Sequence, residues 1–413
     1  MAGGADTDVV VVGAGLAGLA CARTLERAGL DVVVLERGDA VGGRVRTDVV
    51  DGFRCDRGFQ LLNPAYPAVR RLVDVGALRL GTFEAGVAVR RGDGPGGLAV
   101  VADPRRAPAL AAATVRSGYL QPGELARLAR WVAPALGPVS RLRDAPDTTL
   151  AASLDAAGVT GALRHEVLER FLTGVLADDT GRTSAAFVRL LLRSFLVGTP
   201  GVPAHGMQAL PEQLAAGLAR PVRLGVWAAA VGREGRVETP EGPLSARAVV
   251  VATDAVDAQT LTGLGSDPMR GLRTWWFAAD TSPEPRRLLV VDAHGGPVVN
   301  TAVLTAAAPT YAPPGRSLVQ ATTLLPSDAG EAEVRRHLDR LWGTSTAGWE
   351  LVTRHDVDRA LPEQSAPLRA RRRVALGEGL FVCGDHRDTA SIQGALVSGR
   401  RTARAVLADL RAA

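Results

Sequence analysis

VVVVGAGLAGLA, residues 9–20, decides the fold of the N-terminal part of the chain. Its first four residues are a continuous β-branched run, as expected for a strand buried on both faces of a parallel sheet. Gly13, Gly15 and Gly18 then follow with the spacing GxGxxG. The first glycine permits a tight turn, the second lets the backbone approach a pyrophosphate, and the third lets a helix pack against the strand. The loop residues between the glycines are also expected to contact the bound cofactor: Ala14, Leu16 and Ala17.

The segment after this loop continues the same pattern. Apolar residues share one face of a predicted helix that ends at Gly29, and Val32 to Leu35 form a second strand. Glu36 follows directly, where a carboxylate accepts hydrogen bonds from ribose hydroxyls and repels a 2′-phosphate. The next residue, Arg37, is also expected to contact the cofactor. Strand, turn, helix, strand and acid therefore predict a dinucleotide site in a Rossmann-like unit.

A second glycine pair with an arginine, Gly42-Gly43-Arg44, comes soon after Glu36. A plain nicotinamide site does not need it. The Arg44 guanidinium is placed to hold the same pyrophosphate through two hydrogen bonds; the alternative is a surface arginine in a glycine loop. Taken together, GAGLAG, LER and GGRVRT resemble the start of the flavin-containing amine oxidase superfamily, which includes phytoene desaturases and protoporphyrinogen oxidases. This resemblance implies FAD rather than NAD.

Two segments in the middle of the chain resemble parts of the proteins of the same superfamily. CDRGFQLL, from Cys55, is similar to the segment that passes the flavin, which implies contacts by Gly58, Phe59 and Gln60. PAHGMQALPEQLA, residues 203–215, resembles the turn that returns the chain to the FAD domain. Strands are predicted at Val222 to Val226 and at Ala248 to Thr253. In relatives, a residue shortly after the first of these strands contacts adenine through its backbone, and the resemblance implies that role for Ala228.

The C-terminal segment GLFVCGDHRDTASIQGALVSGRRTARAVLADL, from Gly379, resembles the C-terminal flavin motif of the superfamily. A strand ends at Gly384-Asp385, and Asp385 is expected to bind a ribityl hydroxyl. A helix that opens near Gly394 is expected to point its positive end at the flavin, where reduction places negative charge. Gln393 and Ala395 lie in the same turn. Relatives have either Glu or Asp at the acidic position, and Asp is frequent in desaturases.

The resemblance implies an α/β fold with two domains. A Rossmann-like FAD-binding domain is assembled from discontinuous segments, 1–65, 203–262 and 360–413. An α+β substrate domain with a helical cap takes 66–202 and 263–359. The 140 or so residues after CDRGFQLL are rich in Ala, Leu and Arg and are predicted to be helical, with 171–195 similar to the cap. Residues from about 265 to 355 are predicted to form an antiparallel sheet beneath it.

Composition limits the classes of protein that fit. The chain has 413 residues, 46% hydrophobic and 22% charged, and a net charge of +5, which is not the charge block of a nucleic-acid binder. Three cysteines without a CxxC pair argue against a zinc or disulfide site and suggest a reducing compartment. The N-terminal MAGGADTD has no basic n-region and reads as a strand and turn. We expect a cytoplasmic protein without metal or nucleic acid, with possible peripheral membrane contact through the cap.

No Ser-His-Asp set or pair of carboxylates is visible, and a flavin brings its own reactive atom. The catalytic residues are therefore unassigned. Gln60 and His386 are candidates because both neighbour residues expected to contact the cofactor. His386 either moves a proton or only hydrogen-bonds the ribityl chain. No cysteine or histidine lies in a recognisable flavin-linking context, so we expect noncovalent FAD.

The function indicated is an FAD-dependent dehydrogenase, desaturase or oxidase that transfers a hydride from a lipophilic substrate, such as an isoprenoid or tetrapyrrole. Oxygen and a quinone remain open as electron acceptors. The alternatives are an amine oxidase that produces hydrogen peroxide, a non-redox isomerase that holds reduced FAD, and a lipid carrier of the same fold. The sequence contains no lysine, whereas amine oxidases of the superfamily typically place a lysine at flavin N5. This favours oxidation at C–C or C–O centres.

Overall fold

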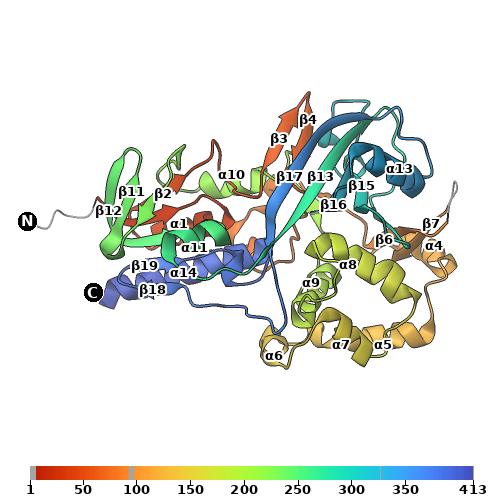
Figure 1. Ribbon diagram of the computed structural model, residues 1–413, viewed down its shortest axis with the longest axis horizontal. Helices are drawn as coiled ribbons and strands as arrows, with labels where there is room; N and C mark the ends of the chain where they lie inside the picture. Colours follow the sequence, from red (N-terminus) through yellow and green to blue (C-terminus); the bar gives the residue numbers. More distant parts are fainter. Residues whose placement is uncertain (1–5, 93–96, 326, 413) are drawn as a thin grey trace, which may run out of the picture.

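The computed structural model describes residues 6–92, 97–325 and 327–412, so the first five residues of MAGGADTD lie outside it. The described residues form one eight-stranded and one seven-stranded sheet, at opposite ends of an elongated molecule (Figure 1). The first strand and the C-terminal helix both lie at the end that holds the eight-stranded sheet. Most of the helices between residues 111 and 197 gather toward the other end, near the seven-stranded sheet.

The eight-stranded sheet is built around the first strand of the chain. β1 (Thr7–Val12) lies between β2 (Val32–Glu36) and β12 (Gly242–Val251), parallel to both. Val9, Val10 and Val11 are fully buried, which is why this strand is continuously apolar. The remaining strands are β9 (Arg223–Leu224), β10 (Ala230–Val231), β11 (Arg236–Thr239), β18 (Ala375–Gly377) and β19 (Leu380–Val382).

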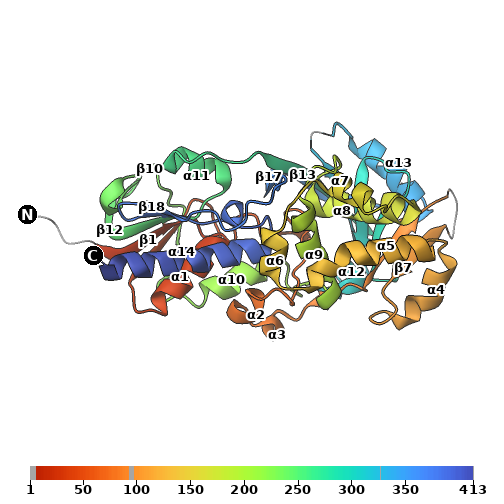
Figure 2. The ribbon, with the colours of Figure 1, turned by 90° about the horizontal axis from the view of Figure 1, so that it is seen from below.

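Helices from the two ends of the chain pack side by side on this sheet. α1 (Leu16–Glu26) lies along α14 (Ile392–Ala412), and α10 (Ala209–Ala215) lies beside them (Figure 2). A Cβ at Gly399 of α14 would collide with the main chain of Ala17, so the two helices meet at backbone distance. The predicted α/β fold with a Rossmann-like start is confirmed. The strand predicted at residues 222–226 is only two residues long.

The seven-stranded sheet runs in the order β17-β13-β16-β15-β14-β6-β7. Its long members, β13 (Met269–Ala279) and β17 (Glu350–Pro362), form a two-stranded ribbon that reaches back toward the first sheet (Figure 1). The others are β14 (Leu289–Asp292), β15 (Val298–Val303), β16 (Ser317–Leu324), β6 (Gly86–Arg90) and β7 (Leu98–Ala102). Antiparallel pairing prevails, with β14 and β6 parallel.

The helical prediction for the segment after CDRGFQLL is wrong in part. β6 and β7 lie within it, and β5 (Gly81–Thr82) pairs with β8 (Gly201–Val202). The two apolar runs GVAVR and LAVVA are short, so their periodicity does not separate strand from helix. Pairing of β6 with β14, some 200 residues further along the chain, makes them strands.

The helices of the cap are α4 (Ala111–Arg116), α5 (Pro122–Val132), α6 (Val139–Asp144), α7 (Leu150–Ala156), α8 (Glu169–Leu176) and α9 (Ala185–Val197). Helices of the cap lie against the second sheet, where α8 packs on β14, β15 and β16 and α4 packs on β7. α8 and α9 fall within the segment predicted to be a cap. The elements outside these layers are β3 (Thr47–Val50), β4 (Phe53–Asp56), α2 (Val69–Leu72), α3 (Val75–Leu78), α11 (Ala255–Thr262), α12 (Leu304–Ala307) and α13 (Glu331–Trp342).

The bounds of the two predicted domains stay a prediction, which limited proteolysis would test. Among the described residues, no helix has both the length and the apolar character needed to cross a bilayer.

Candidate functional site

One large cavity, of about 810 Å³, opens where β1, β2 and β12 end and continues to the second sheet and the cap. Its volume is within the range of ~300–1,000 Å³ found for small-molecule sites, and the carboxyl ends of parallel strands are where α/β sheets bind ligands. The cavity has two parts. We call the part lined by the first sheet and its loops the groove, and the part lined by the cap helices, the second sheet and residues 61–66 the apolar chamber.

The three glycines of GxGxxG have different surroundings. Gly13 has φ +106°, and a Cβ there would lie 2.9 Å from the carbonyl oxygen of Ala252. A Cβ at Gly18 would collide with the carbonyl oxygen of Gly13, so the helix lies directly on the loop. Gly15 lines the groove, and a Cβ there would meet nothing within 4 Å. The space in front of Gly15 is therefore the open space of the groove, where a pyrophosphate would fit.

Glu36 lies at the carboxyl end of β2 and lines the groove. Its Oε2 accepts a hydrogen bond from the Ala14 N–H at 2.8 Å, and its Oε1 accepts one from the Gly38 N–H at 2.8 Å. These bonds fix the carboxylate beside the glycine loop. Ala14 and Gly18 are the two residues of the predicted GAGLAG contact set that do not line the cavity; Leu16 and Ala17 do.

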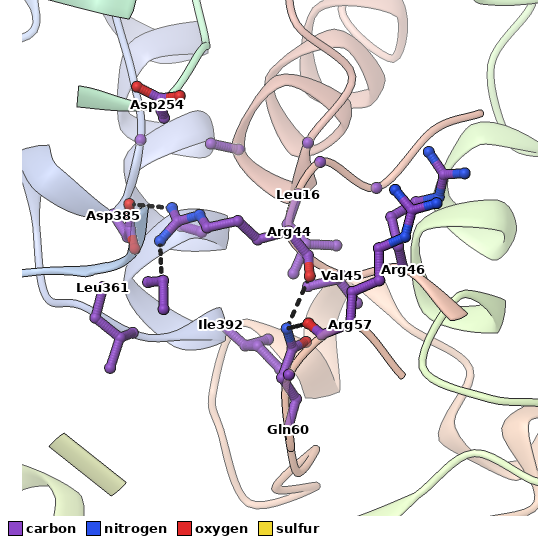
Figure 3. Close-up of a pocket in the computed structure, with 18 of the residues that line it drawn as sticks. Leu16, Arg44, Val45, Arg46, Arg57, Gln60, Asp254, Leu361, Asp385 and Ile392 are labelled. Atoms are coloured by element: carbon purple, nitrogen blue, oxygen red, sulfur yellow. Dashed lines mark hydrogen bonds and ion pairs between the residues drawn. The ribbon is translucent and has the colours of Figure 1, made fainter. Parts of the chain in front are cut away.

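The glycine–arginine element packs against the first glycine loop. The Gly42 N–H donates to the Ala14 carbonyl at 2.9 Å, and Gly43 lies opposite Gly15. Arg44 then crosses the groove (Figure 3). Its Nη2 donates to Asp385 Oδ1 at 2.6 Å and its Nη1 to the Ala360 carbonyl at 2.7 Å. Burial lowers the pKa of Arg44, but the Asp385 carboxylate more than offsets this and the net pKa is raised.

Asp385 is thus paired with Arg44, a contact that the sequence did not predict. Its Oδ1 also accepts the His386 N–H at 3.0 Å, while Oδ2 has no hydrogen-bond partner among the described residues. The side chain is 6% exposed and lines the groove together with Gly384. A free oxygen on a buried, charge-paired carboxylate is a suitable acceptor for a hydroxyl.

Gln60 lies across the groove from Asp385 (Figure 3), next to Gly58 and Phe59, which also line it. Its Nε2 donates to the carbonyl oxygens of Arg44, at 2.8 Å, and Arg57, at 3.3 Å. Its Oε1 is buried and has no partner among the described residues. An acceptor therefore remains free for a ligand.

His386 does not line the cavity. It is 7% exposed and packs on the backbone of Gly384, where a Cβ would collide with the imidazole. Burial lowers the pKa of His386 to about 4; the Asp385 carboxylate opposes this shift, and the neighbouring Arg387 adds to it. The ring is neutral near pH 7. Of the two catalytic candidates, only Gln60 faces the cavity.

The N-terminal end of α14 borders the groove through Ser391, Ile392 and Ala395. Gln393 points elsewhere, because its Oε1 accepts the Ala68 N–H at 2.9 Å. Gly394 is needed for packing, since a Cβ there would collide with the Thr389 carbonyl. The helix begins two residues before the predicted Gly394 and its first turn faces the groove.

At the far end of the groove, residues 225–229 cross the ends of the strands. The Val226 N–H bonds the Glu36 carbonyl at 3.0 Å, and the next two residues, Trp227 and Ala228, line the groove. Trp227 is 46% exposed, unusual for so large an apolar side chain. Arg37 lines the same end and pairs with Asp257 of α11 at 3.2 Å.

The apolar chamber has no charged side chain among the described residues that line it. Aromatic and aliphatic groups make most of its wall, and Phe171 of α8 stacks edge-to-face on Phe195 of α9 with ring centroids 5.3 Å apart. The polar groups are neutral. Burial raises the pKa of Tyr66 to about 12, so its hydroxyl stays protonated at ordinary pH. The other two are the amides of Asn63 and Asn300.

These features fit FAD. An open space faces Gly15, a fixed carboxylate follows β2, and the groove offers unpaired acceptors on Asp385 and Gln60. The model of the flavin containing amine oxidoreductase family matches residues 16–407. The chain belongs to this family. Membership confirms the resemblance found in the sequence and implies an FAD-dependent oxidoreductase.

Several oxidases align with this chain over short segments. Putrescine oxidase of Kocuria rosea is 51% identical over 69 residues, which are 17% of this chain and 14% of that protein. Polyamine oxidase 2 of Arabidopsis thaliana is 44% identical over 70 residues, 16% of this chain and 14% of that protein. Protoporphyrinogen oxidase 2 of the same plant is 42% identical over 71 residues, 17% of this chain and 14% of that protein. The aligned segments thus span 14% of each of these relatives.

Solved structures match the amine oxidoreductase fold over nearly the whole chain. A putative protoporphyrinogen oxidase from Exiguobacterium sp. 255-15 superposes with a TM-score of 0.73 and 19% identity, covering 98% of this chain and 100% of that one. Putrescine oxidase bound to putrescine superposes with a TM-score of 0.68 and 19% identity, covering 97% and 99%. At these identities the likeness shows the fold alone.

Trp227, Gly174 and Asn300 line the cavity but were not predicted from the sequence. Trp227 directly precedes the predicted Ala228, so an aromatic residue beside the adenine contact could have been noticed. Asn300 interrupts the apolar run VVNTAV of β15, and a polar residue inside a buried strand is a signal in its own right. No sequence pattern points to Gly174.

Proposed function

We propose that this chain oxidises a neutral, apolar molecule by means of noncovalently bound FAD. The observation that carries the proposal is the lining of the apolar chamber, which consists of apolar side chains, one protonated phenol and neutral amides. A protonated amine brought into such a chamber loses its hydration without gaining an opposite charge, which costs several kcal/mol. A neutral apolar molecule gains about 25 cal/mol for each Å² that it buries there.

The groove residues hold the cofactor in this proposal. Gly13, Gly15, Gly43 and Arg44 take the pyrophosphate, Glu36 the ribose, Ala228 the adenine, and Asp385 the ribityl chain. FAD, once bound, would supply a two-electron acceptor for the hydride of a substrate C–H bond; the neighbouring carbon or oxygen would lose a proton to water as a C=C or C=O bond forms, and oxygen or a quinone would take up the two electrons.

The protein contributes position and exclusion of water. Gln60 joins segment 58–60 to Arg44 and Arg57 through its Nε2, so the wall between groove and chamber is fixed. Phe171 and Phe195 close the chamber on the cap side. None of the described residues of the chamber titrates near neutral pH, which suits a substrate that gives up its proton to water.

Amine oxidation is the second candidate, and the similarity to putrescine and polyamine oxidases favours it. Two parallel panels separate the candidates. Holoprotein is mixed without oxygen with neutral apolar alcohols and alkenes, and with mono- and polyamines, and loss of the yellow flavin absorbance is followed. We expect reduction by members of the neutral panel only. Flavin reduction by an amine at a rate on the order of 1 s⁻¹ or faster, usual for a true substrate, would favour amine oxidation instead.

Noncovalent attachment has a simple test. The described lining of the cavity contains neither cysteine nor histidine, and Cys21, Cys55 and Cys383 are fully buried elsewhere. Acid precipitation of the holoprotein should leave the yellow colour in the supernatant. A yellow pellet would contradict this part of the proposal.

Cytoplasmic location and peripheral membrane contact also remain proposals. Leu136, Val139 and Val197 are 59%, 46% and 55% exposed. Arg193 of α9 brings their segments together, because its Nη1 donates to the carbonyl oxygens of Ala135 and Gly137. A membrane-bound form would place this patch among the lipids. Flotation with liposomes should carry the protein upward; protein that stays at the bottom would exclude the contact.

A further inference from the structure

Asn300 is the one buried amide of the apolar chamber whose donor has no partner among the described residues. It lies on β15, is 3% exposed and lines the cavity. Its Oδ1 accepts a hydrogen bond from Gln320 Nε2 at 3.0 Å, and no described residue accepts from its Nδ2. The amide N–H groups face the cavity without a protein acceptor, so a ligand that supplies an acceptor oxygen gains a hydrogen bond there.

The direction of the Asn300 amide is set by a chain of hydrogen bonds on β16. Thr322 Oγ1 donates to Gln320 Oε1 at 3.1 Å, which leaves the Gln320 Nε2 facing Asn300. Gln320 and Thr322 are 0% and 1% exposed, and alternate residues of a strand share one face of the sheet. With this hydroxyl donating, the Gln320 oxygen is occupied and the Gln320 Nε2 bonds the Asn300 Oδ1. The outcome is that Asn300 presents N–H groups, rather than an oxygen, to the cavity.

Helix α8 makes room for this amide. A Cβ at Gly174 would collide with Asn300 Nδ2, so a larger residue at that point of the helix would have to displace the amide. Glycine inside a helix costs ~1 kcal/mol relative to alanine. The close approach of the amide is the structural reason for Gly174, and Phe171 and Val175 of the same helix line the chamber on either side.

We propose that Asn300 is a specificity-determining residue that donates a hydrogen bond to an oxygen acceptor, such as a carbonyl, on an otherwise apolar substrate. The inference rests on the proposed function and narrows its substrate class. An N–H donor is attracted to a carbonyl, ether or hydroxyl oxygen and repels an ammonium group. An apolar molecule without an oxygen leaves the donor unpaired, and a protonated amine places like charge against it.

Three compounds of nearly the same size test the preference. Acetophenone carries a carbonyl, cumene replaces its oxygen by a methyl group, and 1-phenylethylamine is a cation at neutral pH. The Kd of each for the holoprotein is measured without oxygen from the change in flavin absorbance, with calorimetry as a check that does not depend on the flavin. The quantity compared is the ratio of the cumene Kd to the acetophenone Kd.

Variants of equal shape separate recognition from packing. In Asn300→Leu we expect the ratio to fall about tenfold, the value of one net hydrogen bond of ~1.4 kcal/mol, through weaker acetophenone binding alone. In Thr322→Val, which leaves Asn300 in place but frees the Gln320 amide to turn, we expect a fall of about threefold. Asn63→Leu is the matched control. The Asn63 Oδ1 accepts from the Ala65 N–H and its Nδ2 donates to the Ser194 carbonyl, so the ratio should not change.

An unchanged ratio in a folded Asn300→Leu protein overturns the proposal, as does an equal fall in Asn63→Leu. If Asn300→Leu does not fold, Thr322→Val decides alone, and an unchanged ratio there overturns it. These results are separate from those for the proposed function. Flavin reduction by amines would refute that function, whereas the ketone preference is a binding measurement on non-reacting compounds.

Discussion

The groove and the apolar chamber share one cavity, but they are built from different contacts. In the groove, main-chain atoms and charges dominate: open space in front of Gly15, a carboxylate held by two N–H groups at Glu36, and an ion pair between Arg44 and Asp385. In the chamber, the described lining is neutral, and recognition depends on shape and on the amide of Asn300. Charge and backbone thus serve a fixed cofactor, while shape and one donor serve a variable substrate.

The largest effect is expected where a side chain would occupy the open space of the groove. Gly15→Val should lower FAD affinity more than 100-fold, because its side chain would enter the space facing the loop. Gly330→Val is the matched control: both glycines precede a helix in an extended conformation, φ −72° and −82°, and both face open space. Gly330 lies outside the cavity lining. FAD titration of the apoprotein checks the difference, and equal affinities would break the assignment of the groove.

Loss of a groove charge should have a smaller effect. Glu36→Ala and Arg44→Ala each remove charge-assisted hydrogen bonds of ~1.5–3 kcal/mol, so the FAD Kd should rise about 10- to 150-fold. Arg105→Ala, which removes an exposed pair with Asp103, is the control. Occupancy is measured from the ratio of flavin to protein absorbance after dialysis. Full occupancy in both groove variants would show that charge does not hold the cofactor.

Trp227 should contribute less, because it is nearly half exposed. Stacking on the adenine is worth ~0.5–1.5 kcal/mol, so Trp227→Ala should raise the FAD Kd roughly 2- to 13-fold. FAD should also quench indole fluorescence in the wild type, and more weakly in the variant. Quenching of equal depth in both proteins would place the adenine away from this end of the groove.

The smallest effect is expected from pH on the binding of a neutral ligand in the cavity. The pKa of Tyr66 is raised to about 12 by burial, so the phenol is protonated throughout the range from pH 7 to pH 10. The pKa of His386 is lowered to about 4, chiefly by burial, so the imidazole is neutral over the same range. Binding of a neutral ligand such as acetophenone should therefore vary less than about twofold from pH 7 to pH 10. A sigmoidal change would reveal a titrating group in the chamber.

The difference between the groove and the apolar chamber also explains which site residues could be predicted from the sequence. The groove residues lie in short motifs because a strand, a tight turn and a helix place them locally: GAGLAG, LER, GGRVRT and CGD each carry their own geometry. Even there, the side chain of Gln393 faces Ala68 and His386 lies behind Gly384. Short-range geometry fixes the backbone of a turn but not which side of it a particular side chain faces.

The Rossmann-like start could be predicted from the residues alone, because glycine conformations and β-branched runs act over a few residues, and the resemblance of the short motifs implied the cofactor and the family. The tertiary structure alone decided that β6 and β7 are strands, since their partner β14 lies some 200 residues away. It alone decided that the Asp385 partner is Arg44 and that Gly174 meets Asn300. The physical reason is common to all three. A non-local contact has no local energetic signature, and it forms only when the folded chain brings its two partners together.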